Sequence, residues 1–230
     1  MSTIIDLTTN HSFVENNGVT IEDNAGKFSG SKALYFDGNS YINFPALAAS
    51  ISNFPACIEA WVKPEINNQS SSDRSGNFNS YGIITKGRPK INSGNNFGLF
   101  LHRYSLDHVL MFKSYSSTFE NMTSSRFTTS TYTPQWYHIA LTISESSSIR
   151  TLKMYINGSL VESDSEPITS TNFTSSDQYL TLGAYKSYYN NTYASSNKFK
   201  GYMSDVRLTC GEIIYTENFD PPTQPHPKNY

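Results

Sequence analysis

Three carboxylates occupy alternate positions in the second half of the chain: Glu162, Asp164 and Glu166, with Ser163 and Ser165 between them. In a β-strand, residues i, i+2 and i+4 point to one face, so these three side chains would line up. A retaining glycosidase needs two carboxyl groups about 5–5.5 Å apart, one of them with a raised pKa so that it can act as an acid. The spacing therefore makes glycoside hydrolysis the first chemistry to consider.

The surroundings of this trio favour a solvated strand end instead. The segment follows the turn Asn157–Gly158 by a few residues and runs into Pro167, and its interleaving residues are serines, where a catalytic strand would place apolar residues that hold the carboxyls rigid. No tryptophan lies nearby in sequence to form a sugar platform. His138 has no Ser or Cys nucleophile elbow to accompany it, so we expect a packed structural histidine. We therefore predict no catalytic residues and no enzymatic activity.

A second group of residues has the chemistry of recognition. It comprises Tyr185, Tyr188, Tyr189, Asn190, Asn191 and Tyr193. Flat aromatic faces next to amide donors and acceptors suit sugar rings and also protein interfaces. Trp61 is a further platform if its face is open. The alternative is a Tyr-rich loop folded over the protein's own edge.

The composition is typical of an all-β protein. Charged residues make up only 16 % of the chain, whereas Tyr (16) and Phe (14) are frequent among many Ser, Thr and Asn. Aromatic and β-branched residues favour strands, and small polar residues favour turns. The 230 residues suit one large β-domain. We expect a single domain over 1–225 and a C-terminal tail over 226–230.

The charge and hydropathy of the chain exclude several partners. A net charge of −2 provides no field that would attract phosphates, so we expect no nucleic-acid binding. No segment approaches the ~20 apolar residues that span a bilayer, and the N-terminus lacks the pattern of a signal peptide. We expect no membrane insertion and no export by the general route.

Short alternating segments separated by turn residues fill the chain. Residues 57–63 and 136–143 place apolar side chains at every second position, and residues 152–161 form two alternating arms around Asn157–Gly158, the strongest short hairpin signal. Residues 33–44 also predict a hairpin, with Asp37-Gly38-Asn39 as its turn. The only candidate helix is a short one over 45–55.

The last strand-like segment begins near Lys198. Its alternation slips at Gly201, which predicts a β-bulge there. After a turn at Cys210-Gly211-Glu212, a further apolar stretch runs to Phe219 and stops at Pro221-Pro222, so we expect the chain to end by closing a sheet. About thirteen short strands, with no repeat and no βαβ rhythm, predict an all-β sandwich of two antiparallel sheets.

The segment GYMSDVRLTCGEIIYTENFDPPTQP, residues 201–225, resembles the terminal signature of laminin-G-like jelly-roll domains of the concanavalin A-like lectin/glucanase superfamily. The order CIEAWVK, WYHIALT and KMYING is similar to the same family, and the resemblance covers about residues 33–225. The aromatic-Thr-x-Asn-Phe-x-Pro-Pro ending resembles the version found in structural proteins of tailed bacteriophages. The departures are the polar N-terminal thirty residues and the polar insertions over 65–80 and 185–197.

The resemblance implies sites as well as a fold. Family members often hold a structural Ca²⁺, and Asp37 and Asp205 match the acidic residues of the family pattern. The alternatives are a turn residue that bonds its own backbone for Asp37 and a partner such as Arg207 for Asp205. No cofactor is required otherwise. The resemblance also places the strands of Cys57 and Cys210 side by side, so the two could face each other, but we expect two reduced, half-buried thiols.

Three functions remain open at this point. The first is a non-catalytic structural and recognition module of a virion, such as a phage tail, fibre or capsid decoration, that contacts copies of itself or other structural proteins. The second is a lectin that binds cell-surface glycans, which would place the protein in a virion appendage, outside the cell or on its surface. The third is a glycosidase that uses Glu162, Asp164 and Glu166, the pattern of the catalytic strand in glucanases with this fold.

Overall fold

The computed structural model describes residues 3–6, 15–44, 56–65, 80–86, 97–104, 107–114, 122–123, 127–128, 134–168, 180–185 and 198–226. These residues form sixteen β-strands and no helix. Five of the strands are only two or three residues long, too short to be recognised from alternation. The helix predicted over 45–55 and nearly all of both polar insertions lie outside the described residues.

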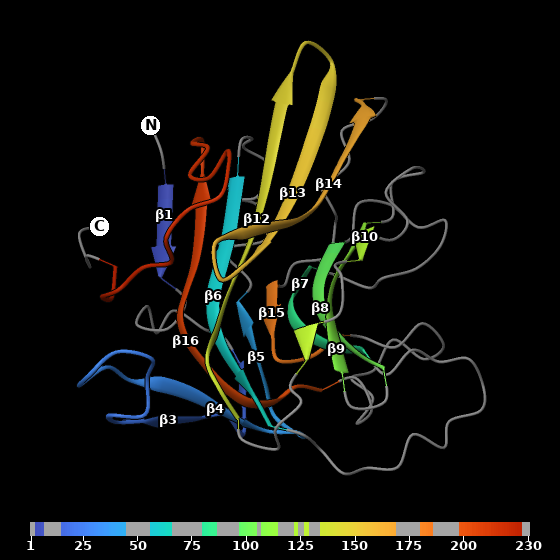
Figure 1. Ribbon diagram of the computed structural model, residues 1–230. Helices are drawn as coiled ribbons and strands as arrows, with labels where there is room; N and C mark the ends of the chain where they lie inside the picture. The colour runs from blue at the N-terminus through green and yellow to red at the C-terminus, as the bar shows by residue number, and fades with distance from the viewer. Residues whose placement is uncertain are drawn as a thin grey trace, which may run out of the picture.

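The strands form two antiparallel sheets that pack face to face (Figure 1). Sheet A has the order β14-β13-β12-β6-β16-β4-β3, with β1 also paired to β16; sheet B has the order β10-β9-β8-β7-β15-β5-β2, with β11 also paired to β9. The strands of sheet A are β1 (Thr3–Asp6), β3 (Thr20–Glu22), β4 (Ala33–Asp37), β6 (Ala56–Pro64), β12 (Tyr137–Ser146), β13 (Ile149–Ile156), β14 (Ser159–Pro167) and β16 (Lys200–Cys210). Those of sheet B are β2 (Glu15–Asn17), β5 (Tyr41–Phe44), β7 (Ser80–Lys86), β8 (Phe97–Tyr104), β9 (Asp107–Ser114), β10 (Met122–Thr123), β11 (Phe127–Thr128) and β15 (Leu180–Leu182). The predicted all-β sandwich is confirmed.

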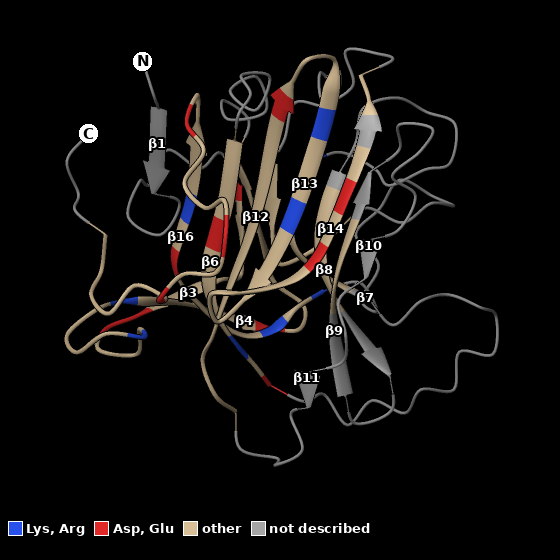
Figure 2. Cartoon of the chain, turned by 45° about the horizontal axis from the view of Figure 1, so that its top comes forward, with Lys and Arg blue, Asp and Glu red and all other residues tan. Residues whose placement is uncertain are grey.

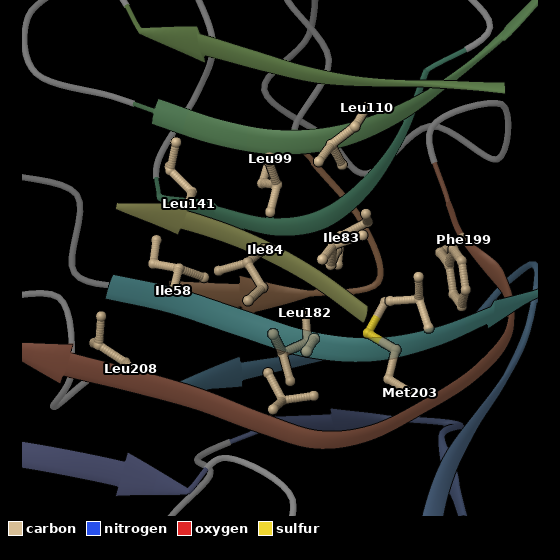
Figure 3. Packing of buried hydrophobic residues seen from close by; sticks show 14 of the residues in the cluster. Ile58, Ile83, Ile84, Leu99, Leu110, Leu141, Leu182, Phe199, Met203 and Leu208 are labelled. Atoms are coloured by element: carbon tan, nitrogen blue, oxygen red, sulfur yellow. The ribbon is translucent and has the colours of Figure 1, made fainter. Parts of the chain in front are cut away.

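The hydrophobic core fills the space between the two sheets. Sheet A contributes Ile58 and Leu141, and sheet B contributes Leu99 and Leu182 (Figure 3). Each such side chain stabilises the fold by roughly 1.5–3 kcal/mol through removal of its apolar surface from water. The predicted inward faces of 57–63 and 136–143 are confirmed, because their alternate apolar residues all belong to this cluster.

Residues 33–44 do not form the predicted hairpin. β4 pairs with β16 in sheet A, whereas β5 pairs with β15 in sheet B, so the turn at Asp37–Gly38 carries the chain from one sheet to the other. Alternation shows that each strand has one buried face, but it does not show which strand lies beside it. Pairing with strands that are distant in sequence replaced the local hairpin here, whereas the hairpin at Asn157–Gly158 is confirmed, with φ values of 48° and 77°.

The bulge in β16 lies further along the strand than predicted. Gly201 keeps its register with both neighbouring strands, and the register shifts instead between Ser204 and Arg207. Asp205, within the shift, has a φ of 51°, in the left-handed region. Gly201 is required for a different reason: a Cβ at this position would lie 2.3 Å from the carbonyl oxygen of Lys63. The slip in the sequence pattern therefore marked a close backbone approach.

The chain does not end by closing a sheet. Residues 211–226, which we call the C-terminal strap, form no strand and lie against the outer face of sheet A (Figure 1, red). The strap is held at the hairpin turn, where the Phe219 N–H donates to the Gly158 carbonyl oxygen at 2.9 Å. Its aromatic residues were expected to pair as a strand, but they pack on the sheet from outside.

The two cysteines lie on neighbouring strands and do not face each other. Cys57 of β6 is in register with Thr209 of β16, and Cys210 is in register with Ala56. Adjacent residues of a strand point to opposite faces, so the two thiols lie on different faces of sheet A. Both are buried and free. The two thiols were expected to be half-buried, but both are fully buried, and their placement on opposite faces keeps them from pairing with each other.

Candidate functional site on the outer face of sheet A

The outer face of sheet A carries a row of polar residues in strands that are otherwise apolar. Acidic and basic residues lie side by side on β6 and β16 (Figure 2). Arg207 of β16 is opposite Glu59 of β6. Two residues further along β6, Trp61 lies between Ser204 of β16 on one side and His138 of β12 on the other. Strand register thus brings Glu59 and Arg207 together, although they are about 150 positions apart in the chain.

Glu59 is the centre of a buried charge cluster. Its Oε2 lies 3.2 Å from Nε2 of His138, and its Oε1 lies 3.4 Å from Nη2 of Arg207. The side chains of Glu59 and His138 are each only 1 % exposed. Burial alone would raise the pKa of Glu59, but the hydrogen bond with His138 and the charge of Arg207 outweigh it, so the pKa is lowered. Glu59 is therefore held as a carboxylate.

The C-terminal strap seals this cluster. The Tyr215 hydroxyl donates to Glu59 Oε2 at 2.8 Å, and the rings of Tyr215 and Phe219 stack in parallel with centroids 3.5 Å apart. Both rings also make edge contacts with the His138 ring. Burial and the Glu59 charge raise the pKa of Tyr215, so its hydroxyl stays a donor. The predicted packed role of His138 is confirmed.

The far end of the strap is held by a second acid. Nδ1 of His226 lies 2.6 Å from Oδ2 of Asp205, the residue in the bulge of β16. Burial raises the pKa of Asp205 to about 6, while the charge of Arg207 opposes the shift. The bulge thus turns the side chain of Asp205 toward the strap, whereas regular alternation would have pointed it elsewhere.

Several buried polar atoms on this face have no hydrogen-bond partner among the described residues. They are Glu59 Oε1, Trp61 Nε1, His138 Nδ1, Arg207 Nε and Thr209 Oγ1. Native proteins leave few such atoms, and those that remain need a reason. Glu59 Oε1 has its charge balanced by Arg207. Trp61 Nε1 has neither a hydrogen-bond partner nor a balancing charge among the described residues, and Trp61 lies near residues 221–225 of the strap.

An open pocket of about 580 Å³ lies next to Trp61, between residues 27–29 and residues 221–225 of the strap. The Trp61 ring is covered on one side by Lys27, whose Nζ lies 4.3 Å from the ring centroid. Phe28 makes an edge contact with the same ring. Trp61 was predicted to be a binding platform only if its ring face is open. The residue is 5 % exposed, so the ring face is not open in this conformation.

The other end of the outer face is not covered by the strap. Here Tyr35 of β4 and Tyr202 of β16 lie opposite each other, with ring centroids 4.8 Å apart. Tyr202 is also in register with Lys63 of β6, and its ring centroid lies 6.5 Å from that of Trp136. We call Tyr35, Tyr202 and Trp136 the aromatic row. All three residues are half-buried.

The carboxylate trio lies on an edge strand. β14 pairs with β13 and with no other described strand, and Asp164 is exposed. The carboxylates of Glu162 and Asp164 accept hydrogen bonds from the backbone N–H groups of Ser163 and Ser165. Charges of this kind on an edge discourage pairing with another chain. The side chain of Glu166 lies outside the described residues.

The two predicted calcium residues lie apart. Asp37 is exposed at the turn after β4, where its Oδ1 accepts the Asn39 N–H at 2.7 Å, and that hydrogen bond lowers its pKa. Asp205 faces His226 in the bulge. Within the described ranges no three His, Cys, Asp or Glu side chains are grouped so that they could hold a metal ion. A structural Ca²⁺ therefore stays a prediction from the family resemblance.

Of the predicted recognition residues, one is described. Tyr185 follows β15, is partly buried, and packs edge-on against Phe100 with centroids 5.1 Å apart. Tyr188, Tyr189, Asn190, Asn191 and Tyr193 lie outside the described residues. Their role in binding stays a prediction.

The described part of the chain also contains no helix long and apolar enough to cross a membrane.

Comparison with models of known protein families identifies the superfamily of this sandwich. The family model of the concanavalin A-like lectin/glucanases superfamily matches residues 36–210. The chain belongs to the concanavalin A-like lectin/glucanases superfamily. Its matched region begins in β4 and ends with β16, so this superfamily match includes the central strands of both sheets. A search of curated protein sequences gave no match.

Solved structures of this superfamily's fold include phage proteins. Tailspike protein 2 of bacteriophage CBA120 is similar with a TM-score of 0.53 and 10 % identity over 86 % of this chain, which spans 28 % of that protein. The carbohydrate esterase vb_24B_21 of the Shiga toxin-encoding bacteriophage phi24B gives a TM-score of 0.51 and 11 % identity over 92 % of this chain and 90 % of that one. The CBM40 of the Ruminococcus gnavus IT-sialidase, bound to α2,6 sialyllactose, gives a TM-score of 0.49 and 14 % identity over 94 % of both chains. At these identities the likeness is one of fold.

Proposed function

We propose that this protein is a non-catalytic recognition and structural module on the surface of a virion. It works by contact, with copies of itself or with other structural proteins of a tail, fibre or capsid decoration. The observation that carries the proposal is the shared fold with a part of a bacteriophage tailspike, at a TM-score of 0.53. The terminal signature over 201–225, similar to that of phage structural proteins, supports the same assignment.

The placement of the acids and bases favours contact over catalysis. Glu59 and His138 are sealed beneath the chain's own Tyr215 and Phe219, so no substrate reaches them while the strap is in place. Glu162 and Asp164 lie on an edge strand and bond their own backbone. A retaining glycosidase would instead hold two carboxyls rigidly in a shaped site.

Glycan binding is the second candidate, and a specific feature favours it. The aromatic row presents three half-buried rings on the part of sheet A that the strap leaves open. The predicted Tyr-rich segment over 185–193 stays a further candidate for contact with glycans or with protein partners.

Three measurements test the proposal. Sedimentation velocity of the full chain, together with labelling of virus particles by an antibody raised against it, should show a defined oligomer or incorporation into particles. Incubation with oligosaccharides, followed by chromatography, should show no hydrolysis. A monomer absent from particles would contradict the structural role. Turnover that disappears in Glu162→Gln would overturn the non-catalytic one.

A further inference from the structure

We infer that the pocket beside Trp61 is a binding site for an organic carboxylate that carries a flat apolar group. The pocket has a volume of about 580 Å³, within the range of small-molecule sites, and lies between residues 27–29 and residues 221–225 of the strap. This site goes beyond the proposed contact role and does not depend on it. The support comes from the fixed walls of the pocket, its one cation and its buried indole.

The loop that forms the first wall is closed by its own hydrogen bonds. The Gly26 N–H donates to the Ser31 carbonyl oxygen and the Ser31 N–H to the Phe28 carbonyl oxygen, each at 3.0 Å. The Ser31 hydroxyl also accepts the Phe28 N–H at 3.1 Å. Ser204 of β16 ties the loop to sheet A, because its hydroxyl donates to the Lys32 carbonyl oxygen at 3.2 Å. This wall is therefore in place before a ligand arrives.

The second wall belongs to the strap and is held at both ends. At one end, Phe219 is bonded to Gly158 of the hairpin turn. At the other end, His226 lies against Asp205 in the bulge of β16. The segment 221–225 between these anchors contains three prolines, whose φ angles are fixed by their rings. Binding between two walls that are already ordered costs little conformational entropy.

Lys27 is a cation with no ion-pair partner among the described residues; its recorded contact is with the Trp61 ring. Lys32 in the same loop differs, because its Nζ lies 2.9 Å from Oδ1 of Asp23. The described residues that line the pocket include Lys27 and no Asp or Glu. A ligand with a single negative charge therefore meets one unpaired positive charge in this pocket.

The remaining lining determines what must be attached to the charge. Phe28, Trp61 and the prolines of 221–225 give the pocket aromatic and aliphatic walls. A small hydrophilic anion would leave these walls in contact with water, whereas a flat apolar group would remove them from water. The pocket thus favours an aromatic carboxylate over phosphate or acetate.

Trp61 gives an independent indication that a ligand is missing. Trp61 is 5 % exposed, and its Nε1 has no acceptor among the described residues. The Lys27 Nζ lies 4.3 Å from the centroid of the indole, so the ammonium group rests on an aromatic ring instead of a counter-charge. A carboxylate has two oxygens. One draws the Lys27 ammonium group from the ring, and the other accepts from the indole N–H.

The test uses three compounds that share a phenyl ring on a short chain. Hydrocinnamate is negatively charged, hydrocinnamamide is neutral and phenylpropylamine is positively charged. Acetate and inorganic phosphate are added as anions without an apolar group. Isothermal titration calorimetry of the full chain gives the affinity for each compound. The fluorescence of Trp136→Phe, in which Trp61 is the one remaining tryptophan, shows whether binding occurs at this pocket.

We expect hydrocinnamate to bind saturably and to change the emission of Trp61. The amide and the amine should bind at least about tenfold more weakly, because they lose the charge-assisted contact with Lys27. Lys27→Gln should weaken hydrocinnamate binding by about tenfold, whereas Lys27→Arg keeps the charge and should stay within about threefold. Lys32→Gln is the matched control, since Lys32 is already paired with Asp23, and it should leave binding unchanged.

Three results would overturn the inference: no saturable binding of hydrocinnamate, equal affinity for hydrocinnamate and its amide, or unchanged binding by a folded Lys27→Gln chain. Acetate or phosphate that binds as tightly as hydrocinnamate would also contradict it, because the apolar walls would then contribute nothing. Should Lys27→Gln fail to fold, the comparison of acid, amide and amine on the unsubstituted chain decides alone. Oligomerisation and incorporation into particles test the proposed function and are independent of these outcomes.

Discussion

Glu59 determines how the outer face of sheet A is organised at the level of single residues. It accepts from Tyr215 and lies within ion-pair distance of His138 and Arg207, so one buried carboxylate links two neighbouring strands and the strap. Alternation over 57–63 separates Glu59 from the apolar residues of that strand, but it does not identify the partners of Glu59. A lone charged residue in the apolar strand 57–63 was the available signal, because a charge in a central strand is rarely left unpaired.

Glu59→Gln tests the importance of this carboxylate. The amide keeps the shape but removes the carboxylate that pairs with the buried Arg207, which should lower the free energy of unfolding by about 3–5 kcal/mol. Urea denaturation followed by tryptophan fluorescence measures the loss. The control is Asp164→Asn at an exposed position of the edge strand β14, which should change stability by less than about 0.5 kcal/mol. Equal effects of the two substitutions would contradict the central role of Glu59.

Asp205 should make stability depend on pH in an unusual direction. Its pKa rises from 3.8 to about 6 on folding, so its contribution is fully present below about pH 4 and is lost as the pH rises through about 6. Asp205→Asn should remove this loss. Between pH 4 and pH 7, the free energy of unfolding of this variant should rise by up to roughly 2 kcal/mol relative to that of the unsubstituted chain. The pKa shift of Asp205, at about 1.36 kcal/mol per pKa unit, would give a somewhat larger rise.

Asp37→Asn is the matched control, because its sign is opposite. Hydrogen bonding lowers the pKa of Asp37, so its contribution is present above the ordinary pKa and is lost as the pH falls. Denaturation curves collected from about pH 2 to pH 8 cover both transitions and distinguish the two substitutions. The same pH trend in both variants would refute the assignment for Asp205.

The hairpin turn between β13 and β14 supports the strap at the level of elements. Gly158 accepts the Phe219 N–H, and a Cβ on Gly158 would lie within van der Waals overlap of the Phe219 carbonyl oxygen. The Asn157–Gly158 pair thus has two roles, of which the sequence pattern predicted one. The second depends on the path of the strap, which turn preferences do not encode.

Gly158→Ala should therefore disturb more than the turn. Gly30→Ala is the matched control, because Gly30 has a similar φ, 73° against 77°, and nothing within 4 Å of the added Cβ. Left-handed strain alone costs about 1–2 kcal/mol, which both variants share. Gly158→Ala should cost at least about 1 kcal/mol more and should speed hydrogen exchange of the Phe219 amide. Identical stability and exchange in the two variants would show that the strap does not rest on this turn.

Strand positions could be predicted from the sequence better than strand partners. Alternation located the strands around Ile58, Leu141 and Leu152 because each buries one face in a shared core. The sheet change at Gly38 and the unpaired strap were missed, since both depend on contacts between distant segments. The aromatic row was missed for the same reason: Tyr35, Tyr202 and Trp136 are far apart in sequence, and only the pairing of β4 with β16 and the ring contact of Trp136 with Tyr202 bring them together.

The two thiols report on the whole molecule. Cys57 and Cys210 lie on opposite faces of sheet A, each about 1–3 % exposed. Burial raises the pKa of Cys210 to about 11 and that of Cys57 well above its ordinary value. In the native chain at pH 8, neither should react with Ellman's reagent within minutes, and both should react in urea. Rapid reaction of one thiol under native conditions would show that its face of the sheet opens locally.

The position of β16 has a consequence for synthesis of the protein. It is the last strand along the described chain, yet it lies between β6 and β4 in the middle of sheet A. While the ribosome is still translating the earlier segments, β6 and β4 each expose an unpaired edge and half of an apolar face. Such edges invite association between nascent chains. Folding of this sandwich must therefore wait until residue 210 has left the exit tunnel, and holding chaperones should matter most during that interval.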